Sequence, residues 1–177
     1  VDFRKLSKSG LFFFQVVLVK LQEQLNYNTL WQGIYLSAYG VICLIGFSYV
    51  AKLILKRLVI ERGAAIFIGL NGLFVAVLSY ATNEWVIWVT GLIAGIFNAL
   101  GYTSLLTSFS NTEGESRQGW VMGIALSAIA LAFLVGGAMM SLLDILGPNN
   151  LLLIGGLIMF VSSLLMRVYC RLKKVAE

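Results

Sequence analysis

The stretch that decides the fold class covers residues 85–112 and reads WVIWVTGLIAGIFNALGYTSLLTSFSNT, without one charged side chain. A hydrocarbon core about 30 Å thick is crossed by roughly 20 apolar residues in a helix that rises about 1.5 Å per residue. The helical form is required because backbone polar groups in lipid must be satisfied within their own segment. This stretch therefore predicts a transmembrane helix.

Comparable uncharged runs occupy residues 33–51, 63–83, 118–143 and 145–166. The whole chain is 59% hydrophobic and only 12% charged, whereas about 25% of the residues of a soluble domain are charged. The net charge of +5 could indicate a nucleic-acid partner, but the Lys and Arg residues lie in short clusters between apolar runs. That placement indicates membrane orientation, so we expect a lipid bilayer and no nucleic acid as the partner.

The first apolar segment is short, because the run at 11–19 is interrupted by Lys20 and Glu23. If it crosses, all of the 13 basic residues except Lys20 share one side, and the connections near Asn26, Asn83 and Pro148 on the other side contain none. If it does not cross, the first thirty residues lie outside and carry four basic residues with them. The positive-inside rule therefore favours six spans with both termini in the cytoplasm.

We therefore expect an all-α, polytopic membrane protein, with residues 1–177 forming one domain in a plasma membrane, the inner membrane of a bacterium. Turn residues at 81–83, 111–114 and 147–150 predict short connections and antiparallel neighbours. The expected transmembrane spans are 9–27, 31–55, 63–82, 85–110, 118–143 and 149–170.

Polar residues form a stripe on the second predicted helix, where Gln32, Tyr35, Tyr39 and Tyr49 share one face. Tyr49 fits an aromatic belt at the membrane interface better than an internal position. Gln32, Tyr35 and Tyr39 fit either packing or the lining of a substrate cavity.

The fourth predicted helix carries Gly91, Gly95, Asn98 and Tyr102 on one face. A GxxxG step allows close packing, with Asn98 as a hydrogen-bonding strut. Alternatively, Asn98 and Tyr102 line a cavity, because an asparagine in mid-membrane needs a partner or water.

The fifth predicted helix has a seam of small residues that predicts helix packing. Its members are Gly119, Gly123, Ser127, Ala130 and Gly137.

Lys20 and Glu23 lie one turn apart in the first segment. Lys20 is expected either to form an intrahelical ion pair with Glu23 or to extend its side chain to the membrane interface. If the pair faces water, it is a candidate for substrate binding or proton coupling. Gln15, in the same segment, is a further candidate for the cavity.

Enzymatic chemistry has little support, since the chain has no histidine and its two cysteines, Cys43 and Cys170, lack metal-site spacing. Asp144 has no second carboxylate near it in the sequence, and no glycine-rich phosphate loop is present. We expect no enzyme activity, no cofactor and no metal.

Two passages resemble the C-terminal six-helix half of a major facilitator superfamily transporter, closest to its drug/proton antiporter-type members. Residues 46–57 (GFSYVAKLILKR), followed by Glu61-Arg62-Gly63, resemble the basic loop after the second helix of that half. Residues 116–127 (SRQGWVMGIALS) resemble the Gln-Gly-x-x-x-Gly entry to its fifth helix.

The resemblance implies a secondary transporter, by symport or antiport, that moves a small molecule with protons by alternating access. It also implies that the first and fourth helices line the cavity and that the second and fifth pack between halves. A missing N-terminal half or a second subunit would complete the pathway. A membrane scaffold or accessory subunit that only packs against partner helices is the alternative.

Overall fold

The computed structural model describes residues 12–52, 60–112 and 118–176, which are almost entirely helical and include no strand. This confirms the all-α class expected from the uncharged runs. The helices are α2 (Phe12–Leu25), α3 (Thr29–Ile45), α5 (Ile60–Tyr80), α6 (Glu84–Thr112), α7 (Gln118–Met139) and α8 (Leu143–Ala176). A π-helical turn, Gly46–Val50, continues α3, and a 3₁₀ turn, Met140–Leu142, joins α7 to α8.

Four stretches of the described chain are long and apolar enough to cross a membrane: Thr29–Val50, Arg62–Tyr80, Glu84–Ser108 and Met122–Val168. The last one includes most of α7 and of α8. α2 has 14 residues, which at about 1.5 Å per residue is shorter than the roughly 30 Å of a hydrocarbon core. Apolar helices of this length are typical of a membrane-embedded protein, whereas six spans stay a prediction.

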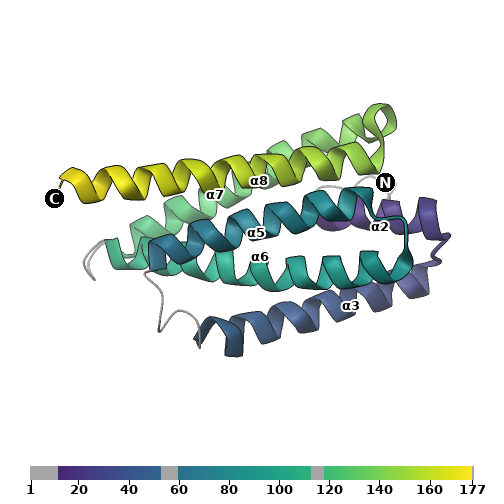
Figure 1. Ribbon diagram of the computed structural model, residues 1–177, viewed down its shortest axis with the longest axis horizontal. Helices are drawn as coiled ribbons and strands as arrows, with labels where there is room; N and C mark the ends of the chain where they lie inside the picture. The colour runs from purple at the N-terminus through teal and green to yellow at the C-terminus, as the bar shows by residue number, and fades with distance from the viewer. Residues whose placement is uncertain (1–11, 53–59, 113–117, 177) are drawn as a thin grey trace.

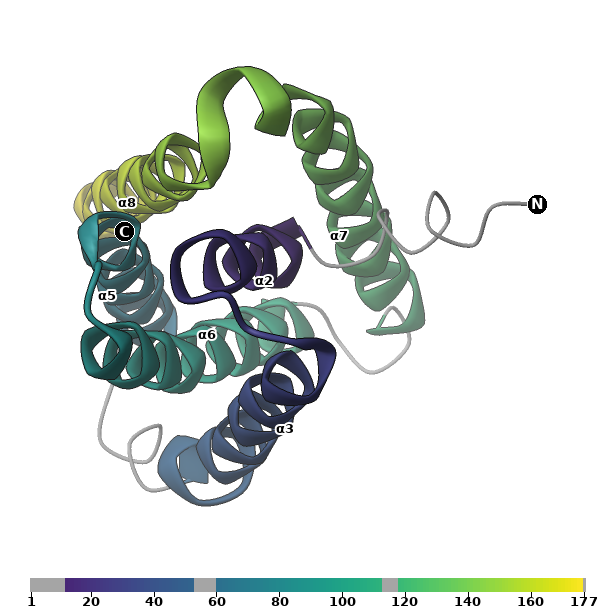
Figure 2. The ribbon, with the colours of Figure 1, turned by 90° about the vertical axis from the view of Figure 1, so that its right-hand side faces the viewer.

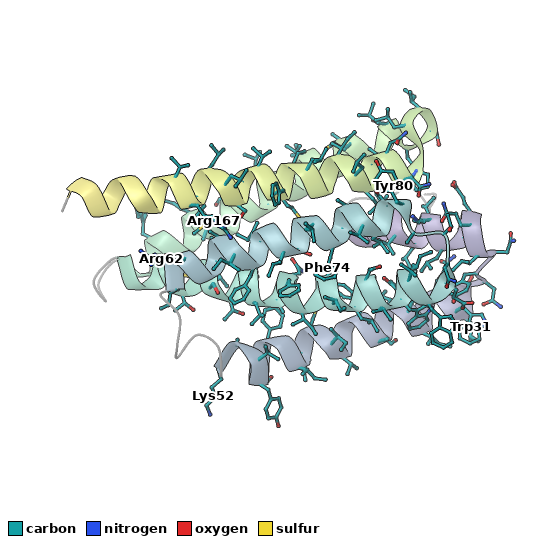
Figure 3. The ribbon with its side chains drawn as sticks, in the orientation of Figure 1. Trp31, Lys52, Arg62, Phe74, Tyr80 and Arg167 are labelled. Atoms are coloured by element: carbon teal, nitrogen blue, oxygen red, sulfur yellow. The ribbon has the colours of Figure 1, made fainter. Side chains whose placement is uncertain are left out.

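The helices lie lengthwise beside one another (Figure 1), and the two ends of the bundle carry different side chains (Figure 3). Figure 3 places Trp31 and Tyr80 at the end where α2 turns into α3 and α5 into α6. Lys52, Arg62 and Arg167 lie toward the opposite end in the same view. We call these the tryptophan end, with Trp31, Trp85 and Trp88, and the basic end.

The connections at the tryptophan end have clear local causes. Asn28 caps α3 by accepting a hydrogen bond from the Trp31 backbone N–H at 3.0 Å, and Asn83 accepts one from the Trp85 N–H at 2.9 Å. Gly147 adopts φ 73°, a conformation that glycine tolerates, and Pro148 follows it. This break divides α8 within the turn predicted at 147–150.

α2 lies inside the ring of the other helices when the bundle is viewed end-on (Figure 2). Its side chains Val16, Val17 and Leu21 are at most 1% exposed. They pack in a cluster with Leu78 of α5 and Leu151 of α8, among others. The first segment of the chain therefore forms the centre of the core at the tryptophan end.

α5 packs along both α6 and α8. At its contact with α8 the two backbones approach closely, because a Cβ built on Gly72 would lie 2.6 Å from the carbonyl oxygen of Gly156. The Ser163 hydroxyl also donates to the Ala65 carbonyl at 2.6 Å. Small residues thus determine how α5 and α8 pack, although the sequence patterns predict such seams only for the fourth and fifth helices.

Candidate functional site

Two stripes that the sequence predicts separately pack against each other. Tyr35 and Tyr39 of α3 are each 2% exposed, and their rings lie over Gly91 and Gly95 of α6. A Cβ on Gly91 would lie 1.9 Å from the Tyr35 hydroxyl oxygen, and one on Gly95 would lie 2.9 Å from a Tyr39 ring carbon. The two tyrosines are therefore packed under α6 and do not line an open cavity.

A chain of polar side chains crosses the bundle between α3, α6 and α5. The Asn98 amide donates to the Tyr39 hydroxyl at 3.4 Å, and the Asn71 amide donates to the Asn98 side-chain oxygen at 3.5 Å. The same Asn71 nitrogen lies 3.6 Å from the sulfur of Met159 on α8. Asn71 is buried, but Asn98 is exposed. Asn98 thus forms hydrogen bonds that link the helices, and part of its side chain is also exposed.

Tyr102 lies one turn after Asn98 on α6 and is 39% exposed. Its ring meets the ring of Phe47, from the π-helical turn, edge to face at a centroid distance of 6.2 Å. Asn98 and Tyr102 are therefore the two predicted cavity residues of α6 that remain accessible.

Lys20 differs from the forms expected from the sequence. Its side chain is 0% exposed, and its ammonium group donates to the carbonyl oxygens of Leu78 at 2.6 Å and Ser79 at 2.8 Å. The last carbonyls of a helix lack intrahelical partners and carry the negative end of the helix dipole, so a cation is favourable there. Lys20 therefore caps α5 and ties α2 to it, and it neither snorkels to the surface nor pairs with Glu23.

The remaining cavity candidates of the first two predicted helices do not gather around one point. Glu23 is exposed, and Gln32 donates to the Tyr27 backbone carbonyl at 3.2 Å, which holds the α2–α3 turn. The side chain of Gln15 lies outside the described residues. The structure thus brings neither Lys20 nor Glu23, the described candidates of the first segment, to Asn98.

The small-residue seam of α7 faces open space for much of its length. A Cβ built on Gly119 or Gly123 would meet no atom of the described residues within 4 Å. Ser127 is exposed and donates to the carbonyl of Gly123 in its own helix at 2.9 Å, while Gly137 is half-buried. No helix of the described chain fills this part of the seam.

A pocket at the tryptophan end was not predicted from the sequence. It has a volume of about 340 Å³ and is lined by Trp31 of α3 and by Glu84, Trp85 and Trp88 of α6. Trp88 donates its indole N–H to the Tyr27 hydroxyl at 2.9 Å, and that hydroxyl donates to the Glu84 carboxylate. The sequence pattern that could have indicated this pocket is an aromatic residue close after each capping asparagine. Trp31 follows Asn28, and Glu84-Trp85 follows Asn83.

Tyr27, in the turn between α2 and α3, connects the parts of this pocket. Its ring lies 5.9 Å from the ring of Trp31. Burial and the hydrogen bond to Glu84 raise the pKa of the Tyr27 hydroxyl, so this group stays protonated and continues to donate at neutral pH.

No family model, no curated protein and no solved structure matches the chain. In architecture, the described chain is helical, and its long apolar helices are those of a membrane-embedded protein.

Proposed function

We propose that this chain is one six-helix half of a secondary active transporter, which moves a small molecule by alternating access with coupled protons. One observation carries the proposal. Asn98 lies near the middle of the apolar segment Glu84–Ser108, and it is exposed although Asn71 and Tyr39 hold it in place. The proposal also rests on the resemblance of residues 46–63 and 116–127 to the transporter family.

The exposure of Asn98 matters because of what surrounds the helix. In lipid, an amide group without enough partners is costly, so polar side chains at this depth normally face a protein partner or a water-filled cavity. Tyr102 is also exposed one turn further along α6. Asn98 and Tyr102 are therefore the best candidates for contacts with a transported molecule.

The open seam of α7 supports a second half. Alternating access needs two halves that rock around a shared site near the middle of the membrane. Helices associate in lipid through small residues that let backbones approach. In the part of the chain that the structure describes, Gly119 and Gly123 have no neighbour within 4 Å of a built Cβ. In the proposed assembly, this seam packs against helices of the other half, which belong to the same polypeptide or to a second subunit.

The test is transport by the assembled protein in proteoliposomes that contain a trapped fluorescent pH indicator. Small molecules are added one at a time, and a substrate should cause protons to cross the membrane. The variants Asn98→Ala and Tyr102→Phe should reduce the rate of this proton movement. Ser162→Ala is the matched control, because Ser162 is exposed on α8 and its hydroxyl donates to the Ile158 carbonyl of its own helix. No proton movement with any compound, together with intact assembly, would favour the scaffold.

Topology is tested separately by cysteine labelling in a variant with Cys43 and Cys170 replaced. Cysteines at Asn83 and Asn149 should react with an impermeant reagent from outside the cell. A cysteine at Lys52, which is exposed at the basic end, should react only after the membrane is opened. Reaction of both sets from one side would reject the proposed orientation in a plasma membrane.

A further inference from the structure

The pocket at the tryptophan end combines aromatic faces with one negative charge. Three of the four tryptophans of the chain line it, together with Glu84. We propose that this pocket binds a quaternary or methylated ammonium group. The inference does not rest on the proposed function, since such binding needs neither flux nor a second half.

Aromatic rings attract a cation through the negative face of the π-system, and tryptophan does so best. A quaternary ammonium group is large, weakly hydrated and has no N–H donor, so it gains from several ring faces at once. The pocket of about 340 Å³ has room for such a headgroup, and its rings come from two helices, α3 and α6. The Glu84 carboxylate adds a direct electrostatic attraction to the cation.

The pocket is largely preformed. Tyr27 accepts from the Trp88 indole at 2.9 Å and donates to Glu84, so one phenol orients both a ring and the carboxylate. The ring of Trp88 also meets the buried ring of Tyr35 in a T-shaped contact, with the ring centroids 5.1 Å apart. Trp31 is 47% exposed and Trp85 is 78% exposed, so the entrance is accessible from the surface. Preorganisation of this kind lowers the cost of binding.

The charges near the tryptophan end also favour a cation. Three of the described carboxylates, Glu23, Glu84 and Asp144, lie in the parts of α2, α6 and α8 that form this end. Among the described residues, the basic side chain near this end is Lys20, whose ammonium group is buried and donates to two carbonyl oxygens. The basic side chains Lys52, Arg62 and Arg167 lie toward the other end (Figure 3).

Binding is measured by intrinsic tryptophan fluorescence of the full chain in a maltoside detergent, which carries no ammonium group. The probe is choline chloride, and the matched control is 3,3-dimethylbutan-1-ol, the uncharged carbon analogue of choline. Sodium chloride at equal concentration controls for ionic strength. A Trp120→Phe background removes the one tryptophan that does not line the pocket. Choline should give a saturable change, and the alcohol and the salt should not.

Variants test which groups hold the cation. Glu84→Gln should weaken choline binding by at least about fivefold through loss of the carboxylate charge. Trp85→Leu should weaken it by about threefold or more, the effect of one exposed cation–π contact. Glu23→Gln is the control, because it removes a charge at the same end without lining the pocket. Circular dichroism and gel filtration verify that each variant is folded.

The ammonium group has two natural forms, a lipid headgroup and a free solute, and reconstitution separates them. The choline titration is repeated in nanodiscs of phosphatidylcholine and of phosphatidylglycerol. Loss of the response only in phosphatidylcholine assigns the pocket to a lipid headgroup. An equal response in both assigns it to a free cation, and both results support the proposal.

Two results would overturn it. The first is an equal fluorescence change with choline and with its uncharged analogue, or none with either, which would leave the tryptophans as an interfacial belt. The second is an equal loss of binding in Glu84→Gln and Glu23→Gln, which would mean diffuse attraction by this end and no specific pocket.

Discussion

Gly91 and Gly95 on α6 and Gly119 and Gly123 on α7 have the same four-residue spacing but different surroundings. The first pair lies under the rings of Tyr35 and Tyr39, whereas nothing lies within 4 Å of a Cβ built on either member of the second pair. A small-residue step therefore shows where another element can approach closely, and it does not show which element does so. In α6 the element is α3 of the same chain, and in α7 the described chain offers none.

A third glycine contact extends this comparison and gives the largest expected effect. Gly72→Ala on α5 would place a Cβ 2.6 Å from the Gly156 carbonyl oxygen, and a backbone cannot move aside as a side chain can. We expect a loss of about 3 kcal/mol in the free energy of unfolding, the upper part of the range for overpacking. Unfolding in a titration with sodium dodecyl sulfate measures it. A loss as small as that of Gly123→Ala would mean that α5 and α8 do not pack this closely.

The tyrosine–glycine contact should be weaker because its clash is with the end of a side chain. Gly91→Ala should cost about 1 to 2 kcal/mol of unfolding free energy. Tyr35→Phe should restore most of this loss in the double variant, because it removes the hydroxyl oxygen 1.9 Å from the new Cβ, and the next atom is 3.1 Å away. Tyr35→Phe alone should be neutral or stabilising, since that hydroxyl is buried and has no hydrogen-bond partner among the described residues. Additive costs in this double-mutant cycle would contradict the contact.

The hydrogen bonds of α6 should contribute less to the free energy of unfolding than the packing of the tyrosine rings against its glycines. Asn71→Ala removes the donor to Asn98 and the contact with Met159. Hydrogen bonds between membrane helices contribute about 0.6 kcal/mol on average, so the unfolding free energy should fall by roughly that amount plus a small packing loss. The same detergent titration measures the change. A loss larger than that of Gly91→Ala would show that hydrogen bonding, not ring packing, holds α6.

The smallest effect is expected at the open seam. Gly123→Ala should leave the unfolding free energy of the single chain unchanged or raise it by less than about 1 kcal/mol, because alanine favours a helix and the space is free. Gly123→Leu should behave similarly in the single chain and should disrupt pairing with a second half, seen by crosslinking. A large destabilisation of the single chain by Gly123→Ala would mean that the seam is already occupied within it.

The buried Lys20 bonds to a helix that lies far from it in the sequence. Its spacing to Glu23 predicts an ion pair, because residues one turn apart are neighbours on a helix. The structure instead brings it to the end of α5, whose carbonyl oxygens at Leu78 and Ser79 are 58 and 59 positions away in the chain. A sequence does not show where the unpaired carbonyls of another helix lie, so only the packing of α2 against α5 could reveal this cap.

The pocket at the tryptophan end also depends on packing between residues that are distant in the sequence. Trp31 precedes Glu84, Trp85 and Trp88 by more than fifty positions, and the turns capped by Asn28 and Asn83 bring them together. Each tryptophan alone is typical of an interfacial belt. Their convergence around one carboxylate depends on the parallel packing of α3 and α6.

The sequence by itself determined the solvent and the secondary structure, because uncharged runs of this length favour helices and lipid through local, additive energies. It also marked the turns at Asn83 and Gly147 and the clusters of basic residues that mark one end of the bundle. Only the tertiary structure decided which glycines have partners, where Lys20 is buried and which rings surround Glu84. These features depend on contacts between helices distant in the chain, whose relative positions are determined by how all the side chains pack together.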